Sequence, residues 1–351
     1  MNILIKKILI KNILIKPIFG SVYKKNKFFT VDTDVNIFFG FKKKLARLGI
    51  SINTLDIGQT KDVDAIVFCD LPFFWEIGYI LTLIRNRKKS VLFCFEPPIF
   101  NPFDYWRIFY LFFPVVYTWN DTLVDDKKIK KFYLPVLDNT ISIPEISFKK
   151  KKFLHMICGN KSAPYLFVLL SGVKKVFYKE RLHAIDFFEK NIPSKFDLYG
   201  GGWNKPKKFS LKEKLFGFKE YVSYKGFVSR APGAKLKIMS KYKFNVCFEN
   251  CEVEGYISEK IIDCFKAHTV PIYLGAPNIE KYIPKNCFID FRDFKDYQSL
   301  LNYLENMDEN TYNKYIQNGK KLLNSKDFKD TLFEEGFLEV FLESIGYEKK
   351  N

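Results

Sequence analysis

The feature that most constrains this chain is a recurrence of short, nearly continuous apolar runs, separated by segments with the spacing of amphipathic helices. Strands buried on both faces of a parallel sheet have such runs, whereas half-exposed strands alternate apolar and polar residues. In the first part of the chain the runs cover residues 12–19, 50–57, 64–69, 90–96 and 115–119. Helical patterns lie between them, at 36–48 and 76–87. This β-α-β order predicts a parallel sheet covered by helices.

A second series of the same kind follows residues 134–152, a proline-containing segment without clear periodicity that predicts a linker. The second series has apolar runs and helical patterns in alternation, at 152–158, 178–190, 195–199, 244–248, 257–267, 270–274 and 287–291. Three helical patterns close the chain, at 297–307, 310–324 and 331–345.

We therefore expect an α/β fold of two doubly wound, Rossmann-like domains that face one another across a cleft. The expected limits are 1–150 and 151–330, followed by a C-terminal helix and tail at 331–351. A length of 351 residues is natural for two domains, although a single large α/β domain is the alternative. Parallel sheets bind ligands beyond the carboxyl ends of their strands, so the cleft is the expected ligand site.

The chain is strongly basic, and the charge is uneven. There are 57 Lys and Arg against 39 Asp and Glu, a net charge of +18, and the first 243 residues hold 44 of the cations against 20 acids. Such a surface attracts anionic lipid headgroups, acidic glycans or nucleic acid; a solvated surface without a partner is the alternative. Only seven of the cations are Arg. The planar guanidinium of Arg binds phosphate with two N–H groups at once, so an Arg in this chain indicates a phosphate site more strongly than a Lys does.

The sequence has no apolar stretch of about 20 residues that would span a bilayer. Its first residues, MNILIKKILIKNILIKPIFG, alternate apolar residues with Lys and lack the unbroken apolar core of a signal peptide. We therefore expect a cytoplasmic protein, in peripheral contact with the inner face of an anionic membrane through its basic half.

Nothing in the sequence predicts a metal site. The seven Cys include no C-x-x-C pair, and the three His stand far apart, so neither a zinc site nor a disulfide framework is indicated. Two D-x-D triplets, Asp32-Thr33-Asp34 and Asp62-Val63-Asp64, have the form of a Mn²⁺ site for a nucleotide-sugar. Triplets arise often by chance and both lie far from the segment described next, so we interpret them as loop or strand-edge acids.

The segment 242–294 is the richest in chemistry. The apolar run at 244–248 leads directly into Glu249 and Asn250, which are therefore expected at the carboxyl end of a sheet. A helix is expected to begin near Ile257, with Glu259 and Lys260 in its first turn, where free backbone N–H groups form an anion site. The cation of Lys260 at the helix start is unfavourable because it opposes the helix dipole. A bound phosphate would explain its presence there; the alternative is that Glu259 and Lys260 are ordinary residues of the helix surface. The pattern alone predicts a nucleotide-diphosphate cleft and names no sugar.

Four motifs of this segment, YKFNVCFEN, GYISEK, VPIYLGAP and FIDFRDF, resemble the donor-binding domain of the α-1,3/4-fucosyltransferases, glycosyltransferase family 10. Weaker similarities, ICGNKSA, ERLHAIDFFEK and KFDLYGGG, extend the resemblance to roughly residues 153–295. The resemblance implies a GT-B fold with an acceptor domain before a donor domain. It also implies inverting transfer of L-fucose from GDP-β-L-fucose to a sugar hydroxyl, without a metal or other cofactor.

The resemblance also assigns roles to residues. Arg181 and Lys260 would pair with the diphosphate, and three side chains would shape the nucleotide and fucose pocket: Asn250, Tyr256 and Glu259. Glu249 would either contact the donor or support Asn250 from behind. Glu96, which follows the apolar run in VLFCFEPP, takes the place of the family's general base, although the flanking PPIFNPFDY departs from the usual surroundings.

The resemblance implies an enzyme that transfers fucose to an N-acetylglucosamine-containing surface glycan such as an oligosaccharide or glycolipid, with α-1,3 linkage, and we expect no nucleic-acid partner. Three alternatives stay open. A related transferase would use another GDP-sugar; a basic nucleic-acid-binding protein would use the Lys clusters and aromatic residues; a non-catalytic protein would bind the sugar without transferring it.

Overall fold

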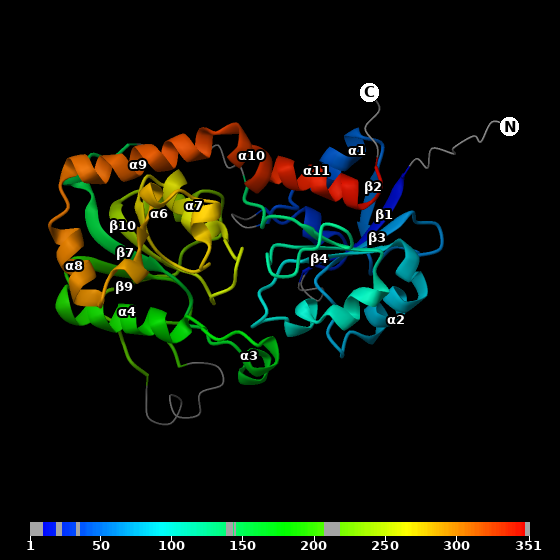
Figure 1. Cartoon of the computed structure of the whole chain (residues 1–351), viewed down its shortest axis with the longest axis horizontal. Helices are drawn as coiled ribbons and strands as arrows, with labels where there is room; N and C mark the ends of the chain where they lie inside the picture. The colour runs from blue at the N-terminus through cyan, green and yellow to red at the C-terminus, as the bar shows by residue number, and fades with distance from the viewer. Residues whose placement is uncertain are drawn as a thin grey trace.

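The structure is a computed structural model that describes residues 10–18, 23–32, 36–137, 143, 145–206 and 218–347. Within these residues the chain forms two parallel sheets of six strands each, one per half of the chain, and helices cover both (Figure 1). The expected pair of α/β domains is therefore present. Asp34 and Pro144, which belong to a D-x-D triplet and to the predicted linker, lie outside the described residues.

The first sheet has the strand order β2-β1-β3-β4-β5-β6, and all of its pairs are parallel. Its central strands β3 and β4 are buried along their whole length, as their apolar runs AIVFC and SVLFC predict. Its strands are β1 Asn12–Lys16, β2 Ser51–Thr54, β3 Ala65–Cys69, β4 Ser90–Cys94, β5 Val115–Thr118 and β6 Ile129–Lys131.

The second sheet has the order β12-β11-β10-β7-β8-β9, again with parallel pairs. The chain winds outward from β7 in one direction and from β10 in the other, so the order reverses between these two strands. In doubly wound sheets the ligand crevice lies at this switch point. The strands are β7 Lys152–Ile157, β8 Phe196–Tyr199, β9 Tyr224–Gly226, β10 Tyr242–Phe248, β11 Val270–Leu274 and β12 Ile289–Asp290.

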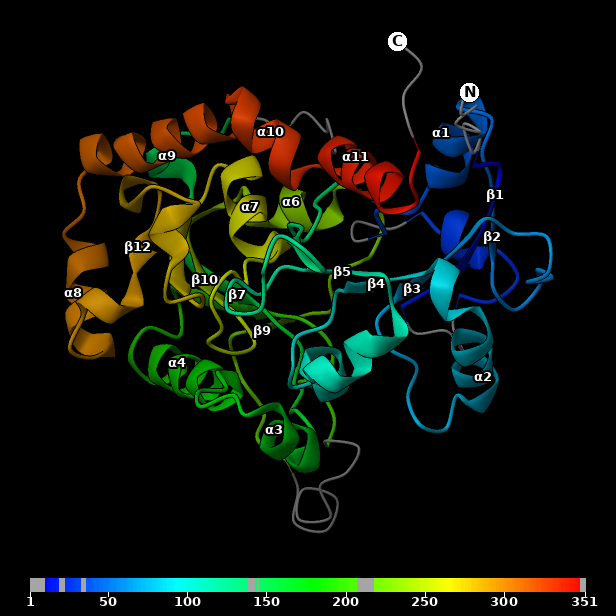
Figure 2. The same ribbon diagram turned by 45° about the vertical axis from the view of Figure 1, so that its right-hand side comes forward.

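Most helices form where helical patterns were predicted, whereas the helices at 165–171 and 234–239 were not predicted. Figure 2 shows how the helices surround the sheets. The α-helices are α1 Phe41–Arg47, α2 Ile77–Asn86, α3 Tyr165–Ser171, α4 Tyr178–Asn191, α6 Ala234–Met239, α7 Glu259–Lys266, α8 Tyr297–Glu305, α9 Glu309–Asn324, α10 Lys326–Leu332 and α11 Glu334–Ser344. The 3-10 helices are η1 Lys27–Phe29, η2 Arg87–Lys89, η3 Pro102–Tyr105, η4 Arg107–Phe112, η5 Phe148–Lys150, η6 Ile279–Lys281, η7 Lys285–Cys287 and η8 Phe291–Asp293.

The end of the chain differs from the single helix predicted at 331–345. Phe333 is extended, with φ −90° and ψ 167°, and it separates α10 from α11. After this break α11 returns to the first domain, where Phe337 and Phe341 join the core on one face of the first sheet. The expected domain limits stay a prediction, but the packing ties the C-terminal helix to the first half of the chain.

This packing predicts a large loss of stability in Phe341→Ala. The Phe341 side chain is fully buried, and its ring centroid lies 5.0 Å from that of Phe41. Truncation of a buried Phe leaves a cavity and costs about 3–5 kcal/mol of unfolding free energy. Urea unfolding measures this loss against Leu48→Ala, an exposed control expected to lose less than about 0.5 kcal/mol. Similar losses in the two variants would contradict the placement of α11 in the core.

Candidate functional site

A cavity of about 340 Å³ lies between the two domains, at the low end of the range of about 300–1,000 Å³ for ligand pockets. It lies beyond the carboxyl end of β10, one strand of the switch point of the second sheet. The residues that line it are Ile18, Tyr23, Phe28, Asn36, Ile37, Phe38, Phe95, Glu96, Pro97, Leu134, Pro135, Asn250, Tyr256, Ser258, Glu259 and Lys260.

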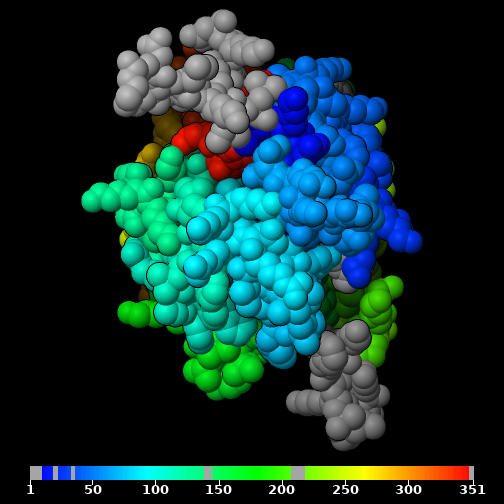
Figure 3. Space-filling model, turned by 90° about the vertical axis from the view of Figure 1, so that its right-hand side faces the viewer, coloured from blue at the N-terminus to red at the C-terminus, as the bar shows by residue number. Residues whose placement is uncertain are grey.

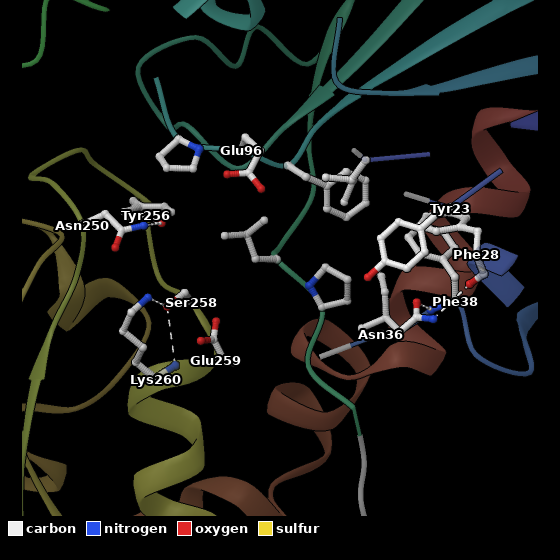
Figure 4. A pocket seen from close by; sticks show the side chains of 16 residues that line it. Tyr23, Phe28, Asn36, Phe38, Glu96, Asn250, Tyr256, Ser258, Glu259 and Lys260 are labelled. Carbon is white, nitrogen blue, oxygen red and sulfur yellow. Dashed lines mark hydrogen bonds between the residues drawn. The ribbon is translucent and has the colours of Figure 1, made fainter. Parts of the chain in front are cut away.

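The cavity has a polar end and an aromatic end (Figure 4). Glu96 from the first domain faces Asn250 and Lys260 from the second at the polar end, and Tyr23 and Phe28 lie at the other. Of the seven predicted site residues, five line this cavity: Glu96, Asn250, Tyr256, Glu259 and Lys260. The other two, Arg181 and Glu249, lie behind the cavity wall.

Glu249 is the buried support of this wall. Its carboxylate is fully buried and accepts hydrogen bonds from the Ser258 backbone N–H at 2.9 Å and from the Lys260 ammonium at 2.9 Å. The backbone of Gly275 packs closely against the Glu249 side chain: a Cβ atom at residue 275 would lie only 2.7 Å from Cγ of Glu249. Glu249 therefore fixes the start of α7 and the position of Lys260.

The helix α7 begins at Glu259, two residues later than predicted. Ser258 is its N-cap, and its hydroxyl accepts a hydrogen bond from the Lys260 backbone N–H. The unfavourable cation in the first turn has a partner within the protein, since the Lys260 ammonium binds both Glu249 and the Ser258 hydroxyl, the latter at 2.8 Å. A bound phosphate is therefore not required to explain Lys260, although its ammonium borders the cavity.

The charges at this helix start reinforce one another. Burial alone would lower the pKa of Lys260, but the charges of Glu249 and Glu259 outweigh it and raise the pKa above its ordinary value. Burial would raise the pKa of Glu259, yet Lys260 and Lys235 lower it to about 2. The cavity wall thus carries a fixed ammonium and a fixed carboxylate near neutral pH.

Arg181 reaches the same wall from α4. Its Nη2 donates to the Phe248 carbonyl at 2.6 Å and to Oδ1 of Asn250 at 2.9 Å, while Asn250 Nδ2 donates to the Tyr256 hydroxyl at 3.1 Å. Among the described residues, the Nε of Arg181 is buried and has no hydrogen-bond partner. Direct contact between Arg181 and a diphosphate stays a prediction, because the side chain lies behind Asn250.

Glu96 follows β4 in the first sheet and faces the second domain. Burial in the cleft and the negative charge of Asp70 raise its pKa to about 8, against the opposing charges of Lys161 and Lys260. A carboxyl group with a pKa near the working pH is well matched to accept a proton in catalysis. The role of Glu96 as a base stays a prediction.

Asp70 holds the backbone of Glu96 and was not among the predicted site residues. It is buried with a left-handed backbone, φ +63°, and its Oδ1 accepts from the N–H groups of Phe95 at 2.6 Å and of Glu96 at 3.0 Å. Burial and the negative charge of Asp70 raise the pKa of Asp104, which is fully buried, well above its usual range. The sequence signal for Asp70 was its place directly after the apolar run at 64–69. No comparable sequence signal marks Asp104.

A polar cluster joins the domains beside the cavity. Asp121, after β5, accepts from the Asn278 amide at 2.6 Å and from the ammonium of Lys131. The loop between β10 and α7 fits against it at Gly255, whose φ is +78° and where a Cβ would lie 2.3 Å from the Trp119 carbonyl oxygen. Only glycine suits this conformation and approach, so the loop that carries Tyr256 is held in place.

The described residues contain no group of three or more His, Cys, Asp or Glu that could hold a metal ion. In the second D-x-D triplet, Asp64 is a structural residue whose Oδ2 accepts from the backbone N–H groups of Lys11 and Asn12, at 2.8 and 2.9 Å. The interpretation of this triplet as loop or strand-edge acids fits that geometry, since Asp64 directly precedes β3.

Residues 185–333 match the family model described as "Glycosyltransferase family 10 (fucosyltransferase) C-term". The chain is 42% identical over 71 residues to "Alpha-(1,3)-fucosyltransferase FucT" of Helicobacter pylori, which is 20% of this chain and 15% of that protein. It is 37% identical over 95 residues to "4-galactosyl-N-acetylglucosaminide 3-alpha-L-fucosyltransferase 9" of Mus musculus, 26% and 24% of the two chains. The matches thus span a quarter or less of each relative.

Solved structures resemble nearly the whole chain. "Crystal Structure of alpha1,3-Fucosyltransferase with GDP" aligns over 99% of this chain and 94% of its own, with a TM-score of 0.58 and 16% identity. An "alpha-glucosyltransferase in complex with UDP-glucose and DNA containing an abasic site" aligns over 96% and 99%, with a TM-score of 0.58 and 10% identity. These likenesses confirm the expected GT-B-like fold of two facing domains, and the family match confirms the resemblance to family 10.

Proposed function

Because residues 185–333 match the C-terminal domain of glycosyltransferase family 10, we propose that this protein is an inverting fucosyltransferase. It transfers L-fucose from GDP-β-L-fucose to a hydroxyl of an N-acetylglucosamine-containing glycan, in α-1,3 linkage. The observation that carries the proposal is the cavity in which Asn250, Tyr256 and Lys260 of the matched segment face Glu96 of the other domain.

In this reaction Glu96 is the general base. The acceptor hydroxyl oxygen forms a bond to the anomeric carbon of fucose from one face of the ring, and the bond to the β-phosphate oxygen breaks on the opposite face. The hydroxyl proton passes to the Glu96 carboxylate, and GDP leaves with the bonding electron pair. Inversion needs only one carboxylate as the base, on the side of the sugar opposite the leaving group. Glu96 fits this role because it lies across the cavity from Lys260, which would face the leaving diphosphate.

The second domain stabilises the leaving group. The β-phosphate of GDP gains negative charge as the bond breaks, and the Lys260 ammonium and the first N–H groups of α7 are fixed donors for that charge. Because Glu249 and Ser258 already hold Lys260, little reorganisation is needed during the reaction. Asn250 and Tyr256 shape the sugar pocket, and Arg181 supports Asn250 from behind and adds positive charge near the diphosphate.

The raised pKa of Glu96 predicts the pH dependence of transfer. A general base works when ionised, and its pKa is about 8, so kcat/KM should rise with pH up to an inflection near that value. Asp70 raises this pKa through its negative charge, so Asp70→Asn should move the inflection to lower pH. A pH series of initial rates measures both, and an inflection that Asp70→Asn leaves unmoved would contradict the influence of Asp70.

The acceptor is proposed from the relatives. The mouse relative is named for a 4-galactosyl-N-acetylglucosaminide, which favours a glycan acceptor such as an oligosaccharide or glycolipid. A Xenopus tropicalis relative, 39% identical over 74 residues, is named "GDP-fucose protein O-fucosyltransferase 3", so a protein hydroxyl is the second candidate.

We place the reaction in the cytoplasm, at the inner membrane face.

A panel of labelled nucleotide-sugars with N-acetyllactosamine and peptide acceptors tests donor and acceptor together. We expect label transfer from GDP-fucose to N-acetyllactosamine, in the presence of EDTA. Transfer from another GDP-sugar alone would reassign the donor, and transfer to peptides alone would reassign the acceptor. Binding of GDP without any transfer would support a sugar-binding protein, and salt-dependent binding of unrelated DNA without binding of GDP would support a nucleic-acid-binding protein.

A further inference from the structure

An unusually apolar surface covers one side of the first domain. It consists of the exposed side chains of residues 74–84 on and before α2, 106–111 in and beside η4, and 165–169 in α3, and we call it the apolar face. Among its members Ile77 is 63% exposed, Ile108 61% and Leu169 66%. Figures 1 and 2 both draw α2 and α3 along the lower side of the molecule, and Figure 3 shows the α2 region from the outside.

The helix α2 is apolar on the side that faces solvent. Ile77, Leu81 and Ile84 are exposed and follow the spacing i, i+4, i+7, so they form one stripe, whereas Leu83 points into the core. A helix on the surface of a soluble domain normally presents polar residues on that side. The exposed stripe of α2 therefore indicates a contact beyond the monomer.

The three parts of the apolar face are continuous. The Trp106 indole N–H donates to the Leu170 carbonyl at 3.3 Å, and the rings of Phe73 and Phe167 stack with centroids 5.9 Å apart, so α3 is fixed against the first domain. Between α2 and η4 lies an apolar hollow of about 240 Å³. Large apolar patches on soluble proteins mark binding sites for proteins or membranes.

In the three segments that form this face, cations outnumber acids. Residues 71–89, 102–112 and 161–175 contain eight Lys or Arg and two acids, Glu76 and Asp104. Both acids are used internally: Asp104 is fully buried, and Glu76 accepts from the Phe73 N–H at 3.0 Å. Three of the seven Arg of the chain, Arg85, Arg87 and Arg107, lie in these segments, and Arg is the cation that binds phosphate best.

We infer that the apolar face docks on the surface of a lipid bilayer that contains anionic phospholipids. The apolar stripe of α2 enters the headgroup region, and Arg85, Arg87 and neighbouring Lys88 bind phosphates beside it. Trp75 and Trp106, two of the four Trp of the chain, are exposed on this face, and Trp prefers the membrane–water interface. This inference does not depend on the proposed transfer reaction.

A second copy of the chain fits this face less well. A symmetric dimer would place the same patch on both sides of the contact, so cations of one face would approach cations of the other, and within the described segments 71–89, 102–112 and 161–175 no exposed acid is present to pair with them. A surface of lipid phosphates supplies the missing negative charge. No helix among the described residues is long and apolar enough to cross a bilayer, and docking at the surface needs none.

Vesicle flotation with the full chain tests this inference. We expect binding to vesicles of phosphatidylcholine mixed with phosphatidylglycerol, and weaker binding when salt is added. The triple variant Ile77→Gln, Leu81→Gln, Ile84→Gln should lose binding, because it removes the stripe. A triple Ala variant of Arg85, Arg87 and Lys88 should bind about 100-fold more weakly, since each cation near an anionic surface contributes about fivefold.

Matched controls come from the second domain. Val222→Gln with Phe227→Gln removes exposed apolar side chains, and a triple Ala variant of Lys314, Lys321 and Lys329 removes exposed cations of α9 and α10. Both should bind vesicles like the unchanged protein, and all variants should keep its thermal unfolding. No binding to mixed vesicles, equal binding by the stripe variant, or a dimer that this variant dissociates without lipid would overturn the inference.

Discussion

Glu96→Gln is expected to lower the rate of fucose transfer by about 10²–10⁴-fold, the contribution of a positioned general base. Glutamine keeps the size of the side chain but cannot accept the acceptor proton. The backbone of residue 96 is held independently of its side chain, because Asp70 accepts from its N–H and the Tyr105 hydroxyl donates to its carbonyl. The variant should therefore fold normally and bind GDP with unchanged affinity.

Two measurements separate the loss of the base from a loss of structure. Single-turnover rates with GDP-fucose report the transfer step, and isothermal titration with GDP reports the nucleotide site. Glu145→Gln, which removes an exposed carboxylate outside the cavity, is the matched control and should keep both values. A Glu96→Gln variant that transfers fucose at the original rate would remove Glu96 from the mechanism.

Lys260→Met is expected to affect both the reaction and the stability of the protein. Loss of one fixed donor to a developing oxyanion lowers kcat by about 10²–10³-fold. The same change leaves the buried Glu249 carboxylate without its cation, and removal of one partner of a buried ion pair costs about 3–5 kcal/mol. The Ser258 hydroxyl and N–H still donate to Glu249, so we expect a loss near the lower limit.

The double variant Glu249→Gln, Lys260→Met distinguishes the two effects. It removes both charges of the pair, so urea unfolding should show much of the lost stability restored while kcat stays low. Lys314→Met, an exposed cation of α9, is the control for both measurements. If Lys260→Met retained full activity at a temperature where it is folded, Lys260 would have no part in stabilising the departing GDP.

The two sheets were predictable because their strands are buried on both faces. The run SVLFCFE, for example, became β4 with Glu96 after it, and YKFNVCFEN became β10 with Glu249 and Asn250 at its carboxyl end. The short elements β6, β9, α3 and α6 were missed, because segments of three to seven residues are too short for a period to emerge.

The site residues that directly follow apolar runs were predictable from the sequence. The contacts between site residues that depend on tertiary packing were not. The pairing of Lys260 with Glu249 joins residues eleven positions apart across a loop, and the pattern of a helix start cannot reveal it. The position of Arg181 behind Asn250 depends on how α4 packs against β10. Asp104 acts on Asp70 only through the fold of the first domain.

The crystal structure of the complex with GDP tests the nucleotide site most directly. We expect the diphosphate at the first turn of α7, with a phosphate oxygen within hydrogen-bond distance of the Lys260 ammonium and Glu96 across the cavity from it. GDP bound elsewhere on the protein, or a diphosphate that lies in the cavity without contact to Lys260 or the α7 N–H groups, would contradict this site.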